Sequence, residues 1–317
     1  MEDKKACTEQ SEVTKDSEKK TRTMISFDWA IKNLLRNKAN FGVLEGFLSE
    51  LIDRDIKIKS IGESEGNKTD KDDKYNRVDI LVEVDNKELV IIELQFDNQH
   101  DYFHRMLYGA SKAITEHIHE GDNYDKVRKV YSINIVYFDL GKGKDYIYRG
   151  TNRFIGINTG DELELSEEQK QIYNRLSIME IFPEYFLLMV RNFEKVGKKK
   201  IDQWMYYLKT NKIQDDFDAQ GLAQARKVLA YENMSEAEKK DYLRNIENRR
   251  IKESELQTAL YKGKNEGFAE GVIEGIEKGE KLNSIKNAKN AKILGLTTEQ
   301  IQKITGLTKE EIENLSC

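Results

Sequence analysis

The stretch NRVDILVEVDNKELVIIELQF, residues 76–96, decides the fold class of this chain. Two runs rich in β-branched and apolar residues, 78–84 and 89–96, flank the polar residues Asp85, Asn86 and Lys87. This pattern predicts a β-hairpin. If the loop is those three residues, Asp79 lies opposite Glu93, with Cβ atoms about 4.5–5.5 Å apart. A two-residue turn would shift the pairing by one position.

The carboxylate within the second apolar run indicates a functional site. Glu93 stands where a charge needs a specific reason, and in a strand it shares a face with Gln95. Two carboxylates as close as Asp79 and Glu93 repel one another, so either one pKa is raised or a cation is bound between them. All-oxygen ligands suit Mg²⁺ or Mn²⁺, which polarise a phosphoryl oxygen and supply hydroxide from bound water. The hairpin therefore predicts metal-dependent phosphodiester hydrolysis.

Helical and strand periods alternate around the hairpin and predict an α/β domain with a mixed sheet. Apolar spacing predicts helices over 27–35, 41–52 and 101–119, and strands over 56–58 and 130–140. From residue 160 onward the chain is expected to be mostly helical, with loops. Glu45 falls on the apolar face of the second helix. It is either a third metal ligand or a boundary residue whose carboxylate reaches solvent.

Other polar residues have two interpretations each. One face of the helix over 101–119 carries residues that contact phosphate or form a solvated face: Arg105, Tyr108 and Lys112. Asp28 and Lys32, four residues apart, are a surface salt bridge or supports of the site. His100 and His104 have the spacing of a zinc pair, but no third ligand follows, which favours surface histidines.

The motif N-R-V-D, thirteen residues, then E-L-Q on a hairpin resembles the PD-(D/E)XK nuclease superfamily, specifically its recombination-promoting nuclease/putative transposase family. The resemblance extends to Phe27-Asp28 with Lys32, to Arg105 with Tyr108, and to the glycine-periodic tail. It implies a restriction-endonuclease-like core, a mixed sheet flanked by helices, with a helical C-terminal extension. It further implies a DNA endonuclease linked to recombination or mobile elements.

Carried over residue by residue, the resemblance makes Asp79, Glu93 and the backbone carbonyl of Leu94 the ligands of Mg²⁺ or Mn²⁺. Gln95 then stands where the family's lysine orients the attacking water, and Val78 stands in place of the motif's proline. Gln95 is neutral, so it cannot lower the pKa of water by its charge, but it can hold water and phosphate by hydrogen bonds. The resemblance also favours DNA contact by Arg105 and Tyr108.

Composition restricts the remaining function classes. The 317 residues carry a net charge of -5, which excludes a generally cationic nucleic-acid coat. Cys7 and Cys317 are too few and too far apart for a disulfide framework, which favours the cytoplasm. No apolar stretch is long enough to span a bilayer, so no membrane partner is expected, and the first 23 residues lack the apolar core of a signal peptide.

The expected domain boundaries follow composition and period: a disordered charged tail (1–23), a nuclease-like domain (24–215), a helical region (216–262), a glycine-periodic helix or linker (263–282) and a small helix-turn-helix-like tail (283–317). Glycines every four residues either admit a second helix closely, permitting a homodimer through the C-terminal helical region, or mark a weak helix or connector. Capping boxes at Thr297 and Thr308 predict two short helices.

Two alternatives to a nuclease stay open. The first is a catalytically weak or inactive nuclease-fold protein that acts in nucleic-acid binding or protein assembly. It is motivated by Gln95 in place of lysine and by the net negative charge. The second is a regulator that binds DNA through residues 294–317, which the glutamates in that segment disfavour because they repel phosphates.

Overall fold

The computed structural model describes residues 22–62 and 79–315, which form two compact units, 1–239 and 240–317. Residues 1–21 of the expected tail, Val78 and both cysteines lie outside the described residues. Residues Arg22–Thr23 form β1, which pairs antiparallel with β8 (Lys212–Ile213). Among the described residues, no helix is both long enough and apolar enough to cross a membrane.

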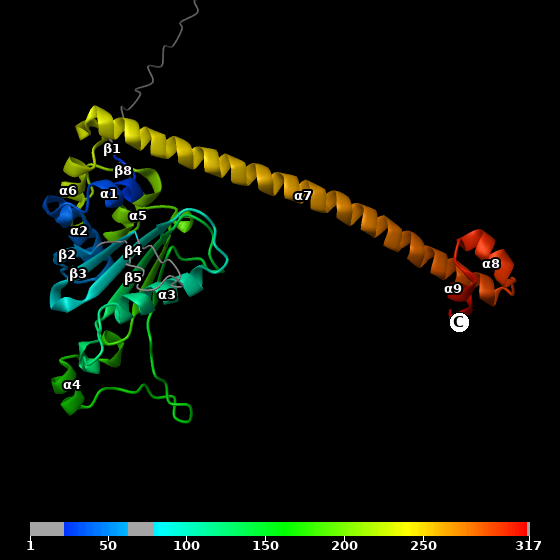
Figure 1. The fold of residues 1–317 in the computed structure, drawn as a ribbon, viewed down its shortest axis with the longest axis horizontal. Coiled ribbons are helices and arrows are strands. Elements are labelled where there is room, and N and C mark those ends of the chain that lie inside the picture. The colour runs from blue at the N-terminus through cyan, green and yellow to red at the C-terminus, as the bar shows by residue number, and fades with distance from the viewer. Residues whose placement is uncertain (1–21, 63–78, 316–317) are drawn as a thin grey trace, which may run out of the picture. The chain divides into compact units, whose positions relative to one another are not determined.

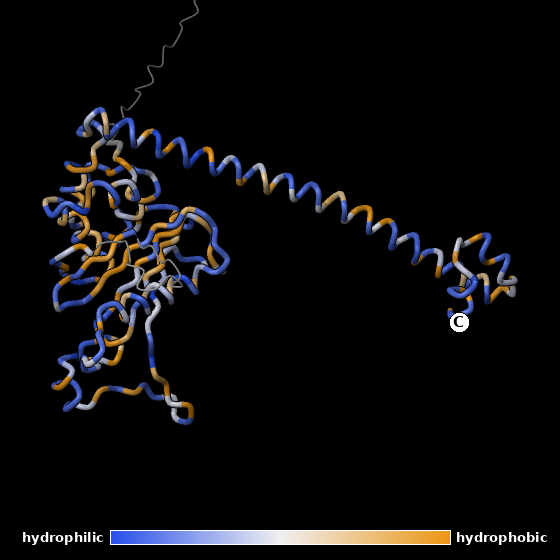
Figure 2. The backbone as a smooth tube through the Cα atoms, in the orientation of Figure 1, coloured by the Kyte–Doolittle hydropathy of each residue, from blue (hydrophilic) through white to orange (hydrophobic). Residues whose placement is uncertain are grey.

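A six-stranded mixed sheet forms the centre of the first unit (Figure 1), in the order β2-β3-β4-β5-β7-β6. The strands are β2 (Ile58–Gly62), β3 (Ile80–Val84), β4 (Leu89–Gln95), β5 (Val130–Val136), β6 (Ile147–Gly150) and β7 (Glu184–Met189). Strands β4, β5 and β7 run parallel, and the other neighbours pair antiparallel. Figure 2 shows the hydrophobic colouring concentrated along these strands. The prediction of a mixed sheet is confirmed.

The hairpin has the predicted three-residue turn. Residues Asp85–Lys87 form the 3₁₀ turn η2, which Lys87 closes with a φ of 61°. Ile80 pairs with Ile92 and Leu81 with Ile91. Continuing this register by one residue places Asp79 opposite Glu93, so the predicted register is confirmed.

Helices flank the sheet: α1 (Phe27–Asn33), α2 (Phe41–Ile52), α3 (Tyr102–Thr115), α5 (Ile201–Thr210) and α6 (Leu222–Val228). Helix α4 (Glu167–Tyr173) has no buried residue and lies beyond the end of the sheet (Figure 1). Short 3₁₀ turns join them: η1 (Lys38–Asn40), η3 (Tyr124–Lys126), η4 (Ile178–Glu180), η5 (Val190–Asn192) and η6 (Tyr231–Asn233). Helix α3 links the parallel strands β4 and β5 and packs Ala110 and Ala113 against Leu89 and Ile91. Helices α1, α2 and α5 lie on the other side of the sheet (Figure 1).

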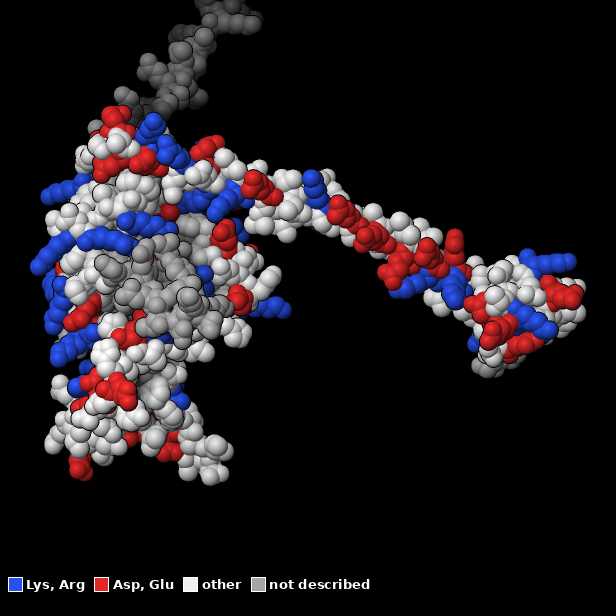
Figure 3. Space-filling view, viewed as in Figure 1, with Lys and Arg blue, Asp and Glu red and all other residues white. Residues whose placement is uncertain are grey.

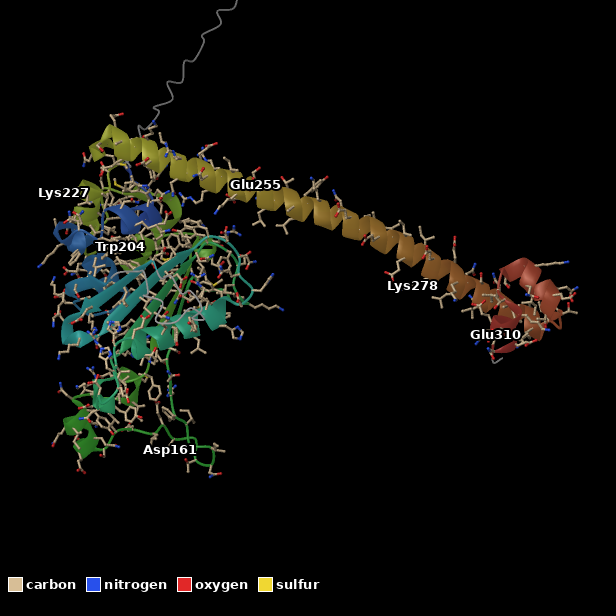
Figure 4. The ribbon with its side chains drawn as sticks, in the orientation of Figure 1. Asp161, Trp204, Lys227, Glu255, Lys278 and Glu310 are labelled. Carbon is tan, nitrogen blue, oxygen red and sulfur yellow. The ribbon has the colours of Figure 1, made fainter. Side chains whose placement is uncertain are left out.

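An aromatic cluster joins the three helices on that second side. Phe27 of α1 and Phe47 of α2 have ring centroids 5.4 Å apart, and Trp204 of α5 lies 5.4 Å from Phe47. Trp204, labelled in Figure 4, is fully buried. This cluster fixes α1 against the sheet, and α1 carries one of the site residues described below.

The expectation of mostly helical structure after residue 160 is wrong for β7, which lies inside the sheet between β5 and β6. Its sequence EYFLLM is almost entirely buried. A strand covered on both faces shows no polar alternation, so periodicity does not distinguish it from a buried helix. The apolar spacing that predicts a helix over 101–119 includes Phe103 and Leu107, but these two side chains are more than half exposed.

Helices joined by short turns make up the described residues of the second unit. Helix α7 (Glu236–Ile293) begins in the first unit and is followed by α8 (Thr298–Thr305) and α9 (Lys309–Glu313). A small core joins them: Ala288, Ala291, Ile301, Leu307 and Ile312. The capping boxes predicted at Thr297 and Thr308 are both present. The glycine-periodic segment 263–282 lies within α7, where Figure 4 labels Glu255 and Lys278 among exposed side chains.

Candidate active site

Asp79 and Glu93 meet at the edge where β3 begins and β4 nears its carboxyl end. Glu93 is 5% exposed, and the Asp79 side chain is 18% exposed. The Leu94 backbone N–H donates to Asp79 Oδ2 at 2.7 Å. In an extended strand the N–H and C=O of one residue point to the same side, so the Leu94 carbonyl also faces the Asp79 side of β4. Two carboxylates and a carbonyl therefore converge beyond the last paired residue of β3.

Each carboxylate is matched by a cation from a different helix. Lys32 of α1 places Nζ 3.4 Å from Asp79 Oδ1, and Arg105 of α3 forms an ion pair with Glu93 Oε1. Arg36, which follows α1, donates to the backbone carbonyl of Asp79 at 3.0 Å. The site therefore combines residues from the hairpin and from the helices on both sides of the sheet.

Burial dominates the protonation of the site. It raises the pKa of Glu93 above the ordinary value, Arg105 acts in the opposite direction, and the negative charge of Asp79 adds to the increase. Burial also raises the pKa of Tyr102, and the charge of Glu93 reinforces that shift. Tyr102 therefore keeps its proton, and its hydroxyl donates to Asn134 Oδ1 at 3.3 Å.

Sequence reasoning missed Asn134, although a signal was present. It interrupts the apolar run VYSINIV as Glu93 interrupts its own, and it is 1% exposed. In the parallel register of β4 and β5, Asn134 lies beside Glu93, and its amide donates to Ser132 Oγ at 3.0 Å. Asn134 and Tyr102 thus form the buried polar floor beneath the carboxylates.

The remaining predicted residues lie at varied distances from this centre. Gln95 is half-buried at the end of β4, and its Nε2 donates to the Asp97 carbonyl at 3.2 Å. Tyr108 and Lys112 are half-buried on α3, and Lys112 Nζ lies 3.7 Å from Glu116 Oε1. Asp28 is 5% exposed, so its side chain lies in the interior and not on the surface.

Glu45 does not join the site. Its Oε1 accepts a hydrogen bond from the Ile58 N–H at 2.9 Å, and its Oε2 lies 3.5 Å from Lys57 Nζ. Ile58 pairs with Val84, at the far end of β3 from Asp79. Five residues of strand separate these ends by about 16 Å. The expectation of Glu45 as a metal ligand is therefore corrected: its carboxylate fixes the start of β2.

The donor set fits one hard cation. Among residues 22–62 and 79–315, no group of three or more His, Cys, Asp or Glu side chains is placed to hold a metal ion, and His100 and His104 are exposed. Mg²⁺ needs fewer, since it is commonly held by one or two carboxylates and retains several waters. Asp79, Glu93 and the Leu94 carbonyl meet that requirement.

A mixed sheet flanked by helices, with paired carboxylates on its hairpin, defines a restriction-endonuclease-like α/β protein. The sequence profile described as "PD-(D/E)XK nuclease family transposase" matches residues 25–259, and the chain belongs to this family. PD-(D/E)XK nucleases generally use divalent metal ions, and the family implies a DNA substrate. No curated protein and no solved structure matches the chain.

Proposed function

We propose that this protein is a Mg²⁺- or Mn²⁺-dependent DNA endonuclease that hydrolyses phosphodiester bonds during recombination or the movement of mobile elements. The observation that carries the proposal is the placement of Asp79 opposite Glu93, with the Leu94 N–H donating to Asp79 Oδ2. Family membership supports a nuclease, and action in the cytoplasm is part of the same proposal.

Asp79, Glu93 and the Leu94 carbonyl would hold the metal ion. When bound, the ion supplies Lewis-acid polarisation of the phosphate and lowers the pKa of an attacking water. Glu93 must be ionised to serve, and Arg105 favours that form by opposing the effect of burial. Asp79 is held in place by the Leu94 N–H, so this carboxylate needs little reorganisation.

Lys32 and Arg105 supply the positive charge that Gln95 lacks. Gln95 orients water and phosphate by hydrogen bonds, but it carries no charge. Lys32 brings an ammonium to Asp79, where the negative charge of the transition state would gather, and Arg105 offers its guanidinium to a phosphate oxygen. Tyr108 and Lys112 extend this contact along α3, and Asp28 supports α1 from its buried position.

A second candidate function is a nuclease-fold protein that binds nucleic acid or assembles with protein without efficient cleavage. The observation that favours it is the neutral Gln95, together with the pairing of both carboxylates by Lys32 and Arg105. Those ion pairs compete with a metal ion for the same oxygens. If they dominate, the fold binds DNA without hydrolysing it.

Cleavage of supercoiled plasmid by the purified full chain separates these functions. We expect the wild type to nick or linearise plasmid with Mg²⁺ or Mn²⁺, and to be inactive with Ca²⁺ or EDTA. Asp79→Asn should lose more than about a hundredfold in rate, because losses of ~10–100-fold follow even from outer-shell changes at metal sites. Glu83→Gln is the matched control, since Glu83 lies on the same strand face and pairs with Arg128. Equal cleavage by wild type and Asp79→Asn would place the chemistry elsewhere.

The same assay tests the division of work between Lys32 and Gln95. Lys32→Met should slow cleavage more than Gln95→Ala does, because only Lys32 supplies charge. The double variant Lys32→Met with Gln95→Lys should recover part of the rate by returning an ammonium to the strand. Lys38→Met, at an exposed position, serves as the control. Folded wild-type protein that binds DNA yet never cleaves it would favour the second candidate function.

A further inference from the structure

A polar cavity lies at the opposite end of the central strands from Asp79 and Glu93. Its walls include the residues at the amino ends of three parallel strands: Glu88 before β4, Lys129 before β5 and Glu184 at the start of β7. Its volume is about 800 Å³. Five residues of β4 separate Glu88 from Glu93, which is about 16 Å of strand. The cavity is therefore distinct from the candidate active site.

The cavity has an excess of positive charge. Six of its lining side chains are cationic and four are acidic. Figure 3 shows Lys and Arg side chains gathered over the part of the first unit that carries α2, β2 and β3. Three of the lining cations come from these elements and their ends: Arg54, Lys59 and Lys87. An anion is therefore the complementary ligand.

The floor of the cavity is a completed ionic network. Lys129 is 3% exposed and donates to the carbonyls of Met179 at 2.6 Å and Phe182 at 2.8 Å, and to Glu184 Oε2 at 3.2 Å. An ammonium has three donors, so Lys129 has none left for a ligand. Its role is to fix the floor and to position Glu184.

Two arginines next to this network have N–H donors that remain available for a ligand. Arg54 forms an ion pair with the buried Glu88 through one terminal nitrogen, and Arg149 pairs with Glu184 through Nε. Their side chains are 36% and 59% exposed. Arg54 is also held over the Tyr131 ring, with its Cζ 5.4 Å from the centroid. A guanidinium has five N–H donors, so both arginines are positioned by a carboxylate while other N–H groups stay open to a ligand.

Three more cations at the cavity have no such carboxylate. None of Lys59, Lys87 and Arg175 forms an ion pair with any residue in the part of the chain that the structure describes. Arg175 is half-buried beside η4, and Lys87 is exposed in the hairpin turn. A set of fixed arginines with unpaired cations at its edge is what a phosphate group requires, because guanidinium forks match its oxygens in pairs.

We propose that this cavity binds a phosphate-bearing small molecule of nucleotide size, through Arg54, Arg149 and Arg175. Its volume falls within the range of small-molecule sites, about 300–1,000 Å³. A concave wall closed by the α4–η4 segment receives a compact anion more readily than the convex backbone of a DNA duplex. The proposal goes beyond nuclease activity and does not depend on metal binding at Asp79.

Calorimetric titration of the full chain in EDTA tests the proposal, with inorganic phosphate, pyrophosphate and ATP as probes. We expect saturable binding of pyrophosphate or ATP, weakened about tenfold or more by Arg149→Ala or Arg175→Ala, as expected for loss of a charged hydrogen bond. Arg153→Ala is the matched control for Arg149. Arg153 also pairs with a glutamate, Glu162, and is 58% exposed, but it does not line the cavity.

A further variant separates this proposal from the proposed nuclease function. Asp79→Asn should bind the probes as the wild type does, even if nuclease activity is absent from both proteins. The proposal fails if no probe binds saturably, or if the Arg149→Ala/Arg175→Ala double variant, with unchanged melting temperature, binds as tightly as wild type. It also fails if Arg153→Ala weakens binding equally. Cavity-dependent binding of a single-stranded oligonucleotide without binding of any small probe would overturn it in favour of a nucleic-acid strand.

Discussion

At the scale of single residues, the Glu93–Arg105 pair sets the pH range of the proposed activity. Burial raises the pKa of Glu93, and Arg105 limits that increase. Metal binding needs the ionised carboxylate, so it is lost as pH falls through this raised pKa. Arg105→Gln removes the limiting charge, so the acid limb of metal binding should move to higher pH. Mn²⁺ binding measured across pH in both proteins gives the two midpoints.

The matched control is Arg128→Gln. Arg128 pairs with Glu83 at 2.8 Å, and that pair lowers the pKa of a solvent-accessible carboxylate on the same hairpin. It should leave the acid limb unchanged. The free energy of unfolding of the metal-free protein tests the raised pKa of Glu93 independently. The folded chain holds the Glu93 proton more tightly than the unfolded chain does. The contribution of Glu93 to this free energy should therefore decrease as pH rises from the pKa in the unfolded chain to the pKa in the folded chain. An unshifted or downward-shifted acid limb in Arg105→Gln would contradict the assignment.

The same residues show what the sequence can predict about a site. The Asp79–Glu93 pairing depends only on the turn Asp85–Lys87, a local feature, so the hairpin pattern predicted it for a three-residue turn but did not by itself exclude a two-residue turn. The Lys32–Asp79 pair joins residues 47 positions apart and exists because an aromatic cluster fixes α1. No local pattern encodes that distance. The prediction of Glu45 as a metal ligand was wrong for the same reason. The helical period correctly placed Glu45 on the face of α2 that packs inward, but it does not indicate which end of β3 the side chain contacts.

At the scale of elements, α2 depends on one close approach. An added Cβ at Gly46 would lie 2.4 Å from both the Gln220 carbonyl oxygen and Gly221 Cα, which are backbone atoms. Gly46→Ala should therefore destabilise the first unit by about 1–3 kcal/mol, as overpacking does. The melting temperature should fall by several degrees, since about 2–4 °C per kcal/mol applies to domains of this size. Thermal unfolding followed by circular dichroism measures it.

The comparison variant for this prediction is Gly150→Ala in β6. The nearest atom to an added Cβ there is Tyr185 Cβ at 3.5 Å, which is an ordinary van der Waals contact. Gly150→Ala should therefore leave the melting temperature nearly unchanged. A melting temperature unchanged by Gly46→Ala would mean that the 220–221 segment moves away from α2 without cost.

Secondary elements were predictable where their period was clear. Helix α2 and strand β5 carry strong patterns, and the capping boxes of α8 and α9 fix those helix starts. Strand β7 was missed because a doubly covered strand has no alternation, and β6 because it is a four-residue edge strand with two half-buried and two exposed residues. The close contact at Gly46 involves a partner more than 170 residues away, so nothing near Gly46 in the sequence reveals it.

At the scale of the whole molecule, α7 requires an explanation for its stability. Residues 250–283 are all exposed, including Leu260 at 65% and Phe268 at 74%. Long helices in proteins owe most of their stability to packing of an apolar face. One ridge repeats at multiples of four residues: Leu256, Leu260, Phe268, Val272 and Ile276. Glycines follow four of these by three residues and so lie beside them on the helix surface. An apolar ridge next to a glycine groove suits a second helix of the same kind.

We therefore expect the full chain to self-associate through α7, and sedimentation velocity measures it directly. The wild type should sediment as a species of twice 36.9 kDa, and a Phe268→Glu/Ile276→Glu variant as the single chain, because two charges on the ridge would have to be desolvated to pack. Leu163→Glu is the matched control, an apolar residue of the first unit that is 61% exposed. It should leave the mass unchanged. A wild type that remains a single chain at every concentration would contradict this prediction. The stability of α7 would then have to come from i,i+4 ion pairs along the helix, such as Lys278 with Glu274.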